Sequence, residues 1–216
     1  MVSEPDRGDE TVTFTRALAR LKREGSNLLV VGSTSDEAHT AVCDRLLGDA
    51  IGGRRRMVVS TERGGCVSHT PADAERVRYE TTTRSAAAAA PTADGPDLDG
   101  DRVQRLSALG TAVAGRLDAD DGFDPAEFRL CLDSLRPLLE EHSERELFRF
   151  LHAVTNEVRA VRGMAHYHLP VAYDNPTVDT LKPLFDAVIE VRSGPDGPQQ
   201  RWHLCDADAG TEWLSL

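Results

Sequence analysis

The sequence predicts an α/β fold with a mainly parallel sheet, helices on both faces and a C-terminal β-hairpin. Short apolar runs alternate along the chain with longer segments of helical periodicity, as strands and helices alternate in parallel sheets. The clearest runs are residues 27–32, 56–61, 128–135 and 163–170. Such continuous apolar character is typical of strands that helices cover on both faces. Residues 187–192 and 199–205 flank the turn-rich segment Ser-Gly-Pro-Asp-Gly-Pro, which predicts the hairpin.

The length of 216 residues suits a single domain with a sizeable core. We expect this domain to span residues 11–216 and to follow a disordered segment at residues 1–10. Residues 85–101 contain five consecutive alanines followed by Pro, Asp and Gly. This composition predicts a flexible low-complexity loop. A half-exposed strand is expected at residues 76–83.

Helices are expected between the strands, at residues 11–23, 103–117 and 181–185 and at two further places with capping boxes. In a capping box, a Ser or Thr and a Glu three residues later satisfy each other's free amides at the helix start. Thr34 and Glu37 fit this pattern, and so do Ser143 and Glu146. The second box opens a long helix with a regular apolar stripe.

The chain is acidic, with a formal net charge of −11. Lys22 and Lys182 are its only lysines, so nearly all of its cations are arginine. We attribute this surface to adaptation to high salt, in preference to an acidic ligand-binding face. Direct nucleic-acid binding is not expected, because a basic footprint is lacking. The polar N-terminus and the absence of a membrane-length apolar run lead us to expect a cytoplasmic protein without membrane contact.

Four cysteines are scattered along the chain without a CxxC pair, so the sequence offers no zinc-knuckle spacing. They are Cys43, Cys66, Cys131 and Cys205. Cys43 and Cys131 lie in apolar segments and are interpreted as small core residues. Disulfides are not expected in a cytoplasmic protein.

The order of motifs resembles the RecA/KaiC branch of P-loop ATPases over residues 14–204. A strand–helix–strand unit is followed by a strand ending in Asp133-Ser134, then by Leu-Arg-Pro-Leu-Leu, a long helix and Gly-Met-Ala-His-Tyr-His-Leu. The chain looks especially like the KaiC-like proteins of halophilic archaea. The resemblance implies a RecA-like sheet with a nucleotide loop after its first strand.

That loop is degenerate in this sequence. A working P-loop, GxxxxGK[ST], uses glycine amides, a lysine and a hydroxyl to hold phosphates and magnesium. Gly32 matches the first glycine, but Glu37, Ala38 and His39 stand where the second glycine, the lysine and the hydroxyl belong. With Asp36, Glu37 also places negative charge where a triphosphate would bind. We therefore prefer a capped turn without ligand to an atypical nucleotide loop. The residues of the degenerate loop are Gly32, Ser33, Thr34, Ser35 and His39, together with Ser134.

Two acidic residues are candidates for catalysis through the resemblance. Asp133 matches the Walker B aspartate, which would hold Mg²⁺ through water. Glu62 resembles the glutamate that would orient the attacking water. Without a phosphate-binding loop, Asp133 has an alternative role, in which it caps the following segment or bonds to a neighbouring strand end.

His166 and His168 alternate on one expected strand, so their side chains point to the same face. This spacing can bind a metal. Asp133 is a separate metal candidate, for Mg²⁺, which the resemblance implies. The sequence shows no third ligand for the histidine pair, so packed or hydrogen-bonded histidines are the preferred interpretation.

The C-terminal segment holds both tryptophans, Trp202 and Trp213, with Arg201 beside the first. In RecA/KaiC assemblies the equivalent edge contributes arginine-bearing contacts to a neighbouring subunit. These three residues are therefore candidates for a protein interface. The preferred alternative is that both tryptophans close the core of the hairpin.

These observations predict a non-catalytic RecA/KaiC-like module that binds no cofactor and acts in signalling or regulation through a protein partner. Formation of a homo-oligomer is a further possibility. The alternative is an atypical ATP-binding protein or ATPase that uses Glu62 and Asp133 with ATP and Mg²⁺.

Overall fold

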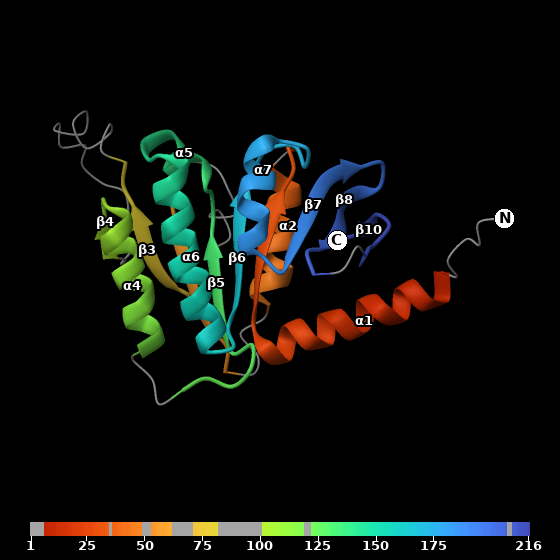
Figure 1. Cartoon of the computed structure of the whole chain (residues 1–216), viewed down its shortest axis with the longest axis horizontal. Helices are drawn as coiled ribbons and strands as arrows, with labels where there is room; N and C mark the ends of the chain where they lie inside the picture. The colour runs from red at the N-terminus through yellow and green to blue at the C-terminus, as the bar shows by residue number, and fades with distance from the viewer. Residues whose placement is uncertain are drawn as a thin grey trace.

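A ten-stranded mixed sheet forms the middle layer of the molecule (Figure 1). The computed structural model describes residues 7–34, 36–48, 53–61, 71–81, 101–118, 122–206 and 209–216. The strand order is β10-β8-β7-β1-β6-β5-β2-β3-β4, and β9 pairs with β8. The strands are β1 Ser26–Val31, β2 Arg55–Ser60, β3 Glu75–Tyr79, β4 Asp101–Val103, β5 Phe128–Leu132, β6 Met164–Leu169, β7 Ala187–Gly194, β8 Gly197–Leu204, β9 Ala209–Gly210 and β10 Leu214–Ser215.

Parallel pairing runs from β7 to β4, and the pairs that β8 makes with β7, β9 and β10 are antiparallel. The expected α/β fold with a mainly parallel sheet and a C-terminal hairpin is thus confirmed. Since β1, β5 and β6 lie inside the sheet and carry helices on both faces, their continuous apolar sequences have a direct physical cause.

Helices cover the sheet on both sides (Figure 1). One face packs against α4, α5, α6 and α7, and the other packs against α2 and α1. In the view of Figure 1, α1 passes beneath the C-terminal hairpin. The helices are α1 Arg7–Glu24, α2 Asp36–Leu47, α4 Leu106–Asp118, α5 Arg136–Glu141, α6 Glu144–Ala160 and α7 Pro176–Leu181, followed by the 3₁₀ turn η2 Lys182–Leu184.

Alternation along each strand divides the core into two layers. On β1, Leu29 and Val31 face α6 and its neighbours, whereas Leu28 and Val30 face α1 and α2. No helix in the described ranges combines the length and apolar character needed to cross a membrane.

Several boundaries differ from those expected. Helix α1 begins at Arg7, inside the segment expected to be disordered, and α4 begins at Leu106 because Val103 belongs to β4. Strand β4 itself was not expected, since three residues are too short for a periodic pattern. Of the expected low-complexity loop, residues 85–100 lie outside the described residues.

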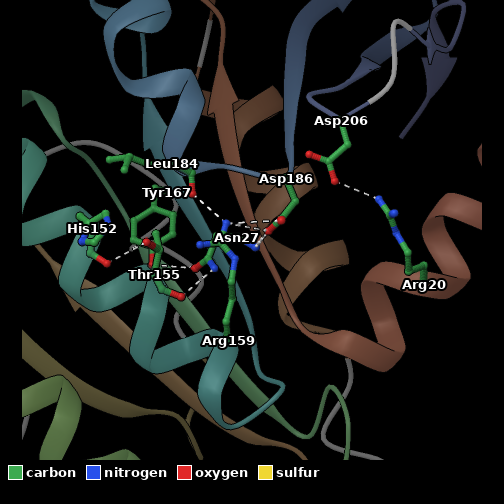
Figure 2. Close-up of polar contacts among 9 residues, drawn as sticks. All are labelled: Arg20, Asn27, His152, Thr155, Arg159, Tyr167, Leu184, Asp186 and Asp206. Atoms are coloured by element: carbon green, nitrogen blue, oxygen red, sulfur yellow. Dashed lines mark hydrogen bonds and ion pairs between the residues drawn. The ribbon is translucent and has the colours of Figure 1, made fainter.

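A buried polar network joins the start of β1 to α6 and β7 (Figure 2). The Asn27 backbone donates to Asp186 at 2.7 Å, and its side-chain amide donates to the Thr155 carbonyl at 3.1 Å. The Tyr167 hydroxyl donates to Asn27 Oδ1 at 3.1 Å. Burial raises the pKa of Tyr167, so this hydroxyl keeps its proton. Arg159 extends the network to Asp186 and the Leu184 carbonyl.

Candidate functional site

The degenerate loop begins at Gly32, at the carboxyl end of β1. Parallel α/β sheets usually bind ligands at this edge. Gly32 has a φ of +152°, and a Cβ at this position would collide with the Val191 carbonyl of β7. Its N–H donates to the Val171 carbonyl at 2.8 Å. The loop is therefore held closely between β7 and the segment that follows β6.

Thr34 is bonded to the hairpin. Its hydroxyl lies 3.0 Å from the Ser193 hydroxyl and accepts from the Ser193 N–H at 3.2 Å. The expected capping role of Thr34 is wrong, because α2 begins at Asp36, two residues further along. Ser35 lies outside the described residues.

Two positions that would face phosphate and magnesium in a P-loop instead face the protein interior. Ala38 is fully buried in the apolar layer beside Leu28 and Val42. His39 is 3% exposed, with Nε2 2.9 Å from the Gly32 carbonyl oxygen and Nδ1 3.0 Å from His168 Nδ1. The side chains at the lysine and hydroxyl positions thus point into the core.

Asp133 follows β5 and is 1% exposed. Its Oδ1 accepts from the Thr61 N–H at 2.8 Å and from the Thr61 hydroxyl at 2.7 Å. Thr61 directly follows β2, which pairs with β5. The structure therefore shows the alternative role of Asp133, a bond to a neighbouring strand end. Ser134 Oγ accepts from the Arg136 N–H at 3.3 Å, and Glu62 lies outside the described residues.

A cleft of about 420 Å³ opens beside the loop, between the ends of β1, β6 and β7. Glu190 in its wall accepts from Arg201 at 2.6 Å and lies 3.3 Å from His203 Nε2. Arg192 stacks on Trp213, with its guanidinium carbon 3.8 Å from the ring centroid. The lining is Gly32, Ser33, Thr34, Ala172, Tyr173, Asp174, Glu190, Val191, Arg192 and Ser193.

A cluster of metal-binding side chains lies between α2 and the sheet, which we call the Cys/His cluster: Cys43, Cys131, His166 and His168. One ligand atom from each residue lies within 4.8 Å of all the others, and no member is more than 2% exposed. The two sulfur atoms are 3.4 Å apart, and His166 Nε2 lies 3.3 Å from Cys43 Sγ. The cluster could therefore hold one ion.

Three elements build this cluster. Cys43 is on α2, Cys131 is on β5, and both histidines are on β6. Cys131 is the register partner of His166 in the β5–β6 pair. The interpretation of the cysteines as core residues was correct about burial, but it missed their contact with the histidine pair. Asp133, the other predicted metal ligand, lies outside the cluster and is bonded to Thr61.

The two tryptophans have different environments. Trp202 is 8% exposed and packs edge-on against Phe14 of α1, with ring centroids 5.9 Å apart. It therefore closes the core of the hairpin, as preferred. Trp213 is half-buried between Arg192 and Arg201, whose guanidinium carbons lie 3.8 Å and 4.7 Å from its ring centroid.

Comparison with known proteins identifies a family. No curated protein matches the chain. A model of DUF7504, described as a family of unknown function, matches residues 25–191. The match covers well over half of the chain and includes the degenerate loop, Asp133 and the whole Cys/His cluster. The chain therefore belongs to DUF7504, a family of unknown function.

Proposed function

We propose that this protein is a non-catalytic RecA/KaiC-like module that acts in the cytoplasm through contact with another protein, in signalling or regulation. The orientation of Ala38 and His39 carries the proposal. Both occupy positions that would contact nucleotide in a P-loop, and both are buried against the sheet. A fold of this kind persists after its chemistry is lost.

Electrostatics at the loop support the same conclusion. A triphosphate needs positive charge to offset its own, and the position of the P-loop lysine holds a buried alanine. The cleft beside the loop contains Asp174 and Glu190. Its arginine, Arg192, is stacked on Trp213 and donates to Gln199 at 2.9 Å.

The proposed contact surface is the group formed by Arg192, Arg201 and Trp213 at the C-terminal edge of the sheet. Tryptophan and arginine are the residues most enriched at the energetic centres of protein interfaces. Leu214, next to Trp213, is 42% exposed. Trp202 takes no part in this surface because it is buried. A second copy of this chain is one partner that the surface could bind.

Calorimetric titration with Mg-ATP and Mg-ADP at molar potassium chloride tests the loss of nucleotide binding. We expect no binding heat. Micromolar binding that disappears in Asp133→Asn but survives in Asp174→Asn would instead support the alternative ATP-binding function. Asparagine retains Oδ1 as an acceptor for Thr61, so Asp133→Asn removes charge with little loss of structure. Asp174→Asn is the control variant, since it removes an acid that lines the cleft beside the loop.

Affinity capture from the native cells, at their own salt concentration, tests the contact surface. We expect Trp213→Ala to lose a partner that the wild-type protein and Trp202→Phe both retain. Size-exclusion chromatography of the same variants reveals whether the partner is a second copy. Equal capture by all three proteins would contradict a role for Trp213.

A further inference from the structure

The Cys/His cluster has the dimensions of a tetrahedral metal site. With Zn–S near 2.3 Å and Zn–N near 2.0 Å, tetrahedral ligand atoms lie about 3.3–3.8 Å apart. The sulfurs of Cys43 and Cys131 are 3.4 Å apart, and His166 Nε2 is 3.3 Å from Cys43 Sγ. All four ligand atoms lie within 4.8 Å of one another, so small side-chain movements suffice to surround an ion.

The hydrogen bonds of His39 define the tautomer of His168. A carbonyl oxygen only accepts, so His39 Nε2 carries the proton that binds the Gly32 carbonyl at 2.9 Å. In the neutral ring, His39 Nδ1 then accepts, and His168 Nδ1 donates to it at 3.0 Å. His168 Nε2 is left with a lone pair. That atom is buried and has no hydrogen-bond partner among the described residues.

We propose that Cys43, Cys131, His166 and His168 bind one zinc ion, with His168 coordinating through Nε2. Metal-bound histidines usually donate their second ring N–H to a polar group, which orients the ring. His39 is that group for His168, and the Gly32 carbonyl in turn holds His39. His39 is therefore a positioning residue for the metal.

The chemistry of the ligands selects the ion. Two thiolates and two imidazoles favour zinc over magnesium or calcium, which prefer oxygen ligands. Zinc replaces the thiol protons of Cys43 and Cys131, so two protons leave for each ion bound. The complex has no net charge, and its burial avoids the cost of an isolated ion in the core. Four protein ligands leave no open position, which indicates a structural centre.

The first experiment uses the full-length protein, purified anaerobically with a reductant and without added metal. Elemental analysis is expected to find one zinc per chain. Replacement by Co²⁺ is expected to give a thiolate-to-cobalt charge-transfer band and the intense visible bands of tetrahedral cobalt. A wild-type protein that binds neither ion stoichiometrically overturns the proposal, as does a disulfide between Cys43 and Cys131 in this preparation.

Variants test the individual ligands. Cys131→Ser and His168→Gln are expected to lose stoichiometric zinc and, for the serine variant, cobalt charge-transfer intensity. Cys205→Ser and His152→Gln are matched controls outside the cluster. Burial raises the pKa of the Cys205 thiol to about 11, which disfavours its thiolate. Equal zinc loss in a variant and its control contradicts the assignment. If Cys131→Ser does not fold, the cobalt spectrum of the wild-type protein still shows whether thiolates bind the metal.

His39→Phe tests the positioning residue. We expect zinc affinity to fall about 10- to 100-fold, with a tetrahedral cobalt spectrum retained, because the ligands remain but His168 loses its acceptor. Competition with a chelating indicator measures the affinity. Unchanged affinity would overturn the role of His39. The zinc measurements do not depend on whether the protein binds ATP. Their result therefore tests the zinc site separately from the proposed function.

Discussion

Asn27 is fully buried at the start of β1 and uses its backbone and its side-chain amide to join three elements (Figure 2). Its Oδ1 accepts from the Tyr167 hydroxyl, and its Nδ2 donates to Thr155 of α6. Buried polar groups at such a junction stabilise the fold only when each finds a partner. The pair formed by Asn27 and Tyr167 is therefore a sensitive point of the core.

Tyr167→Phe is expected to lower the free energy of unfolding by about 1–3 kcal/mol, because Asn27 Oδ1 is left without its donor. Asn27→Leu leaves the Tyr167 hydroxyl unpaired at a similar cost. The double variant should lose less than the sum of the two, because neither partner of the Tyr167–Asn27 hydrogen bond is then left unpaired. Urea unfolding of the four proteins measures the coupling, and strict additivity would contradict it.

At the residue scale, the sequence identified His166 and His168 on one face of a strand. It could not predict the contact of these histidines with Cys43 and Cys131. Cys43 and Cys131 are 88 positions apart, and only pairing of β5 with β6 under α2 brings them together. A CxxC spacing would have been visible, whereas a ligand set drawn from three elements carries no local signal.

Helix α6 shows how local chemistry specifies an element. Its N-cap Ser143 and Glu146 form the expected capping box: Ser143 N–H and Oγ–H donate to Glu146 Oε2 at 3.1 Å and 2.6 Å. These hydrogen bonds hold the pKa of the Glu146 carboxyl below its usual value. A lowered folded-state pKa contributes stability at neutral pH that is lost as the pH falls through that pKa.

Glu146→Gln should therefore make stability less dependent on pH between about pH 6 and about pH 3.5, since no carboxylate remains to be protonated. The urea midpoint across this range measures the effect. Glu144→Gln removes an acid from the same turn but outside the capping box, and it is the matched control. An identical slope in Glu146→Gln and the wild type would contradict the prediction.

The two tryptophans at the β7–β8 hairpin, Trp202 and Trp213, make different contacts. Trp202 packs in the core against Phe14, so Trp202→Ala should lower the free energy of unfolding by about 3–5 kcal/mol. Trp213 contacts two arginines at the surface, and each such contact contributes about 0.5–1 kcal/mol. Thermal and urea unfolding compare the variants. Equal losses would mean that Trp213 is also a core residue.

Strands buried on both faces were predictable, because continuous apolar runs such as β1 and β6 leave a strong signal. Strands β4, β9 and β10 were not, since two or three residues carry too few side chains for a pattern. Their conformation is imposed by pairing with β3 and β8. Tertiary context decides such short elements.

At the scale of the whole molecule, the net charge of −11 opposes folding through self-repulsion. Potassium chloride should therefore raise the urea midpoint as its concentration increases toward molar values, because the Debye length shrinks to about 3 Å. A series with choline chloride, which screens charge equally, separates screening from specific ion effects. A midpoint independent of both salts would contradict the prediction.

The alternation of strands and helices predicted the fold class, but not the neighbours of each strand. β6 lies between β1 and β5, and its pairing with β1 joins Ser26 to Met164. No local pattern encodes such distant pairing. The strand order places both histidines of β6 beside Cys131 of β5. The sequence could not reveal this contact, because it does not reveal the strand order.

Zinc in the Cys/His cluster would also act on the unfolded chain. Cys43 and Cys131 enclose β2, β3, β4 and α4, so a shared ion closes a long loop around one flank of the sheet. Closing a loop of this length removes conformational entropy from the unfolded state, as a covalent cross-link does. Zinc should thus slow amide hydrogen exchange in β2 and β5. Removal of zinc by a chelator should let this flank of the sheet unfold before α6 and β7 do.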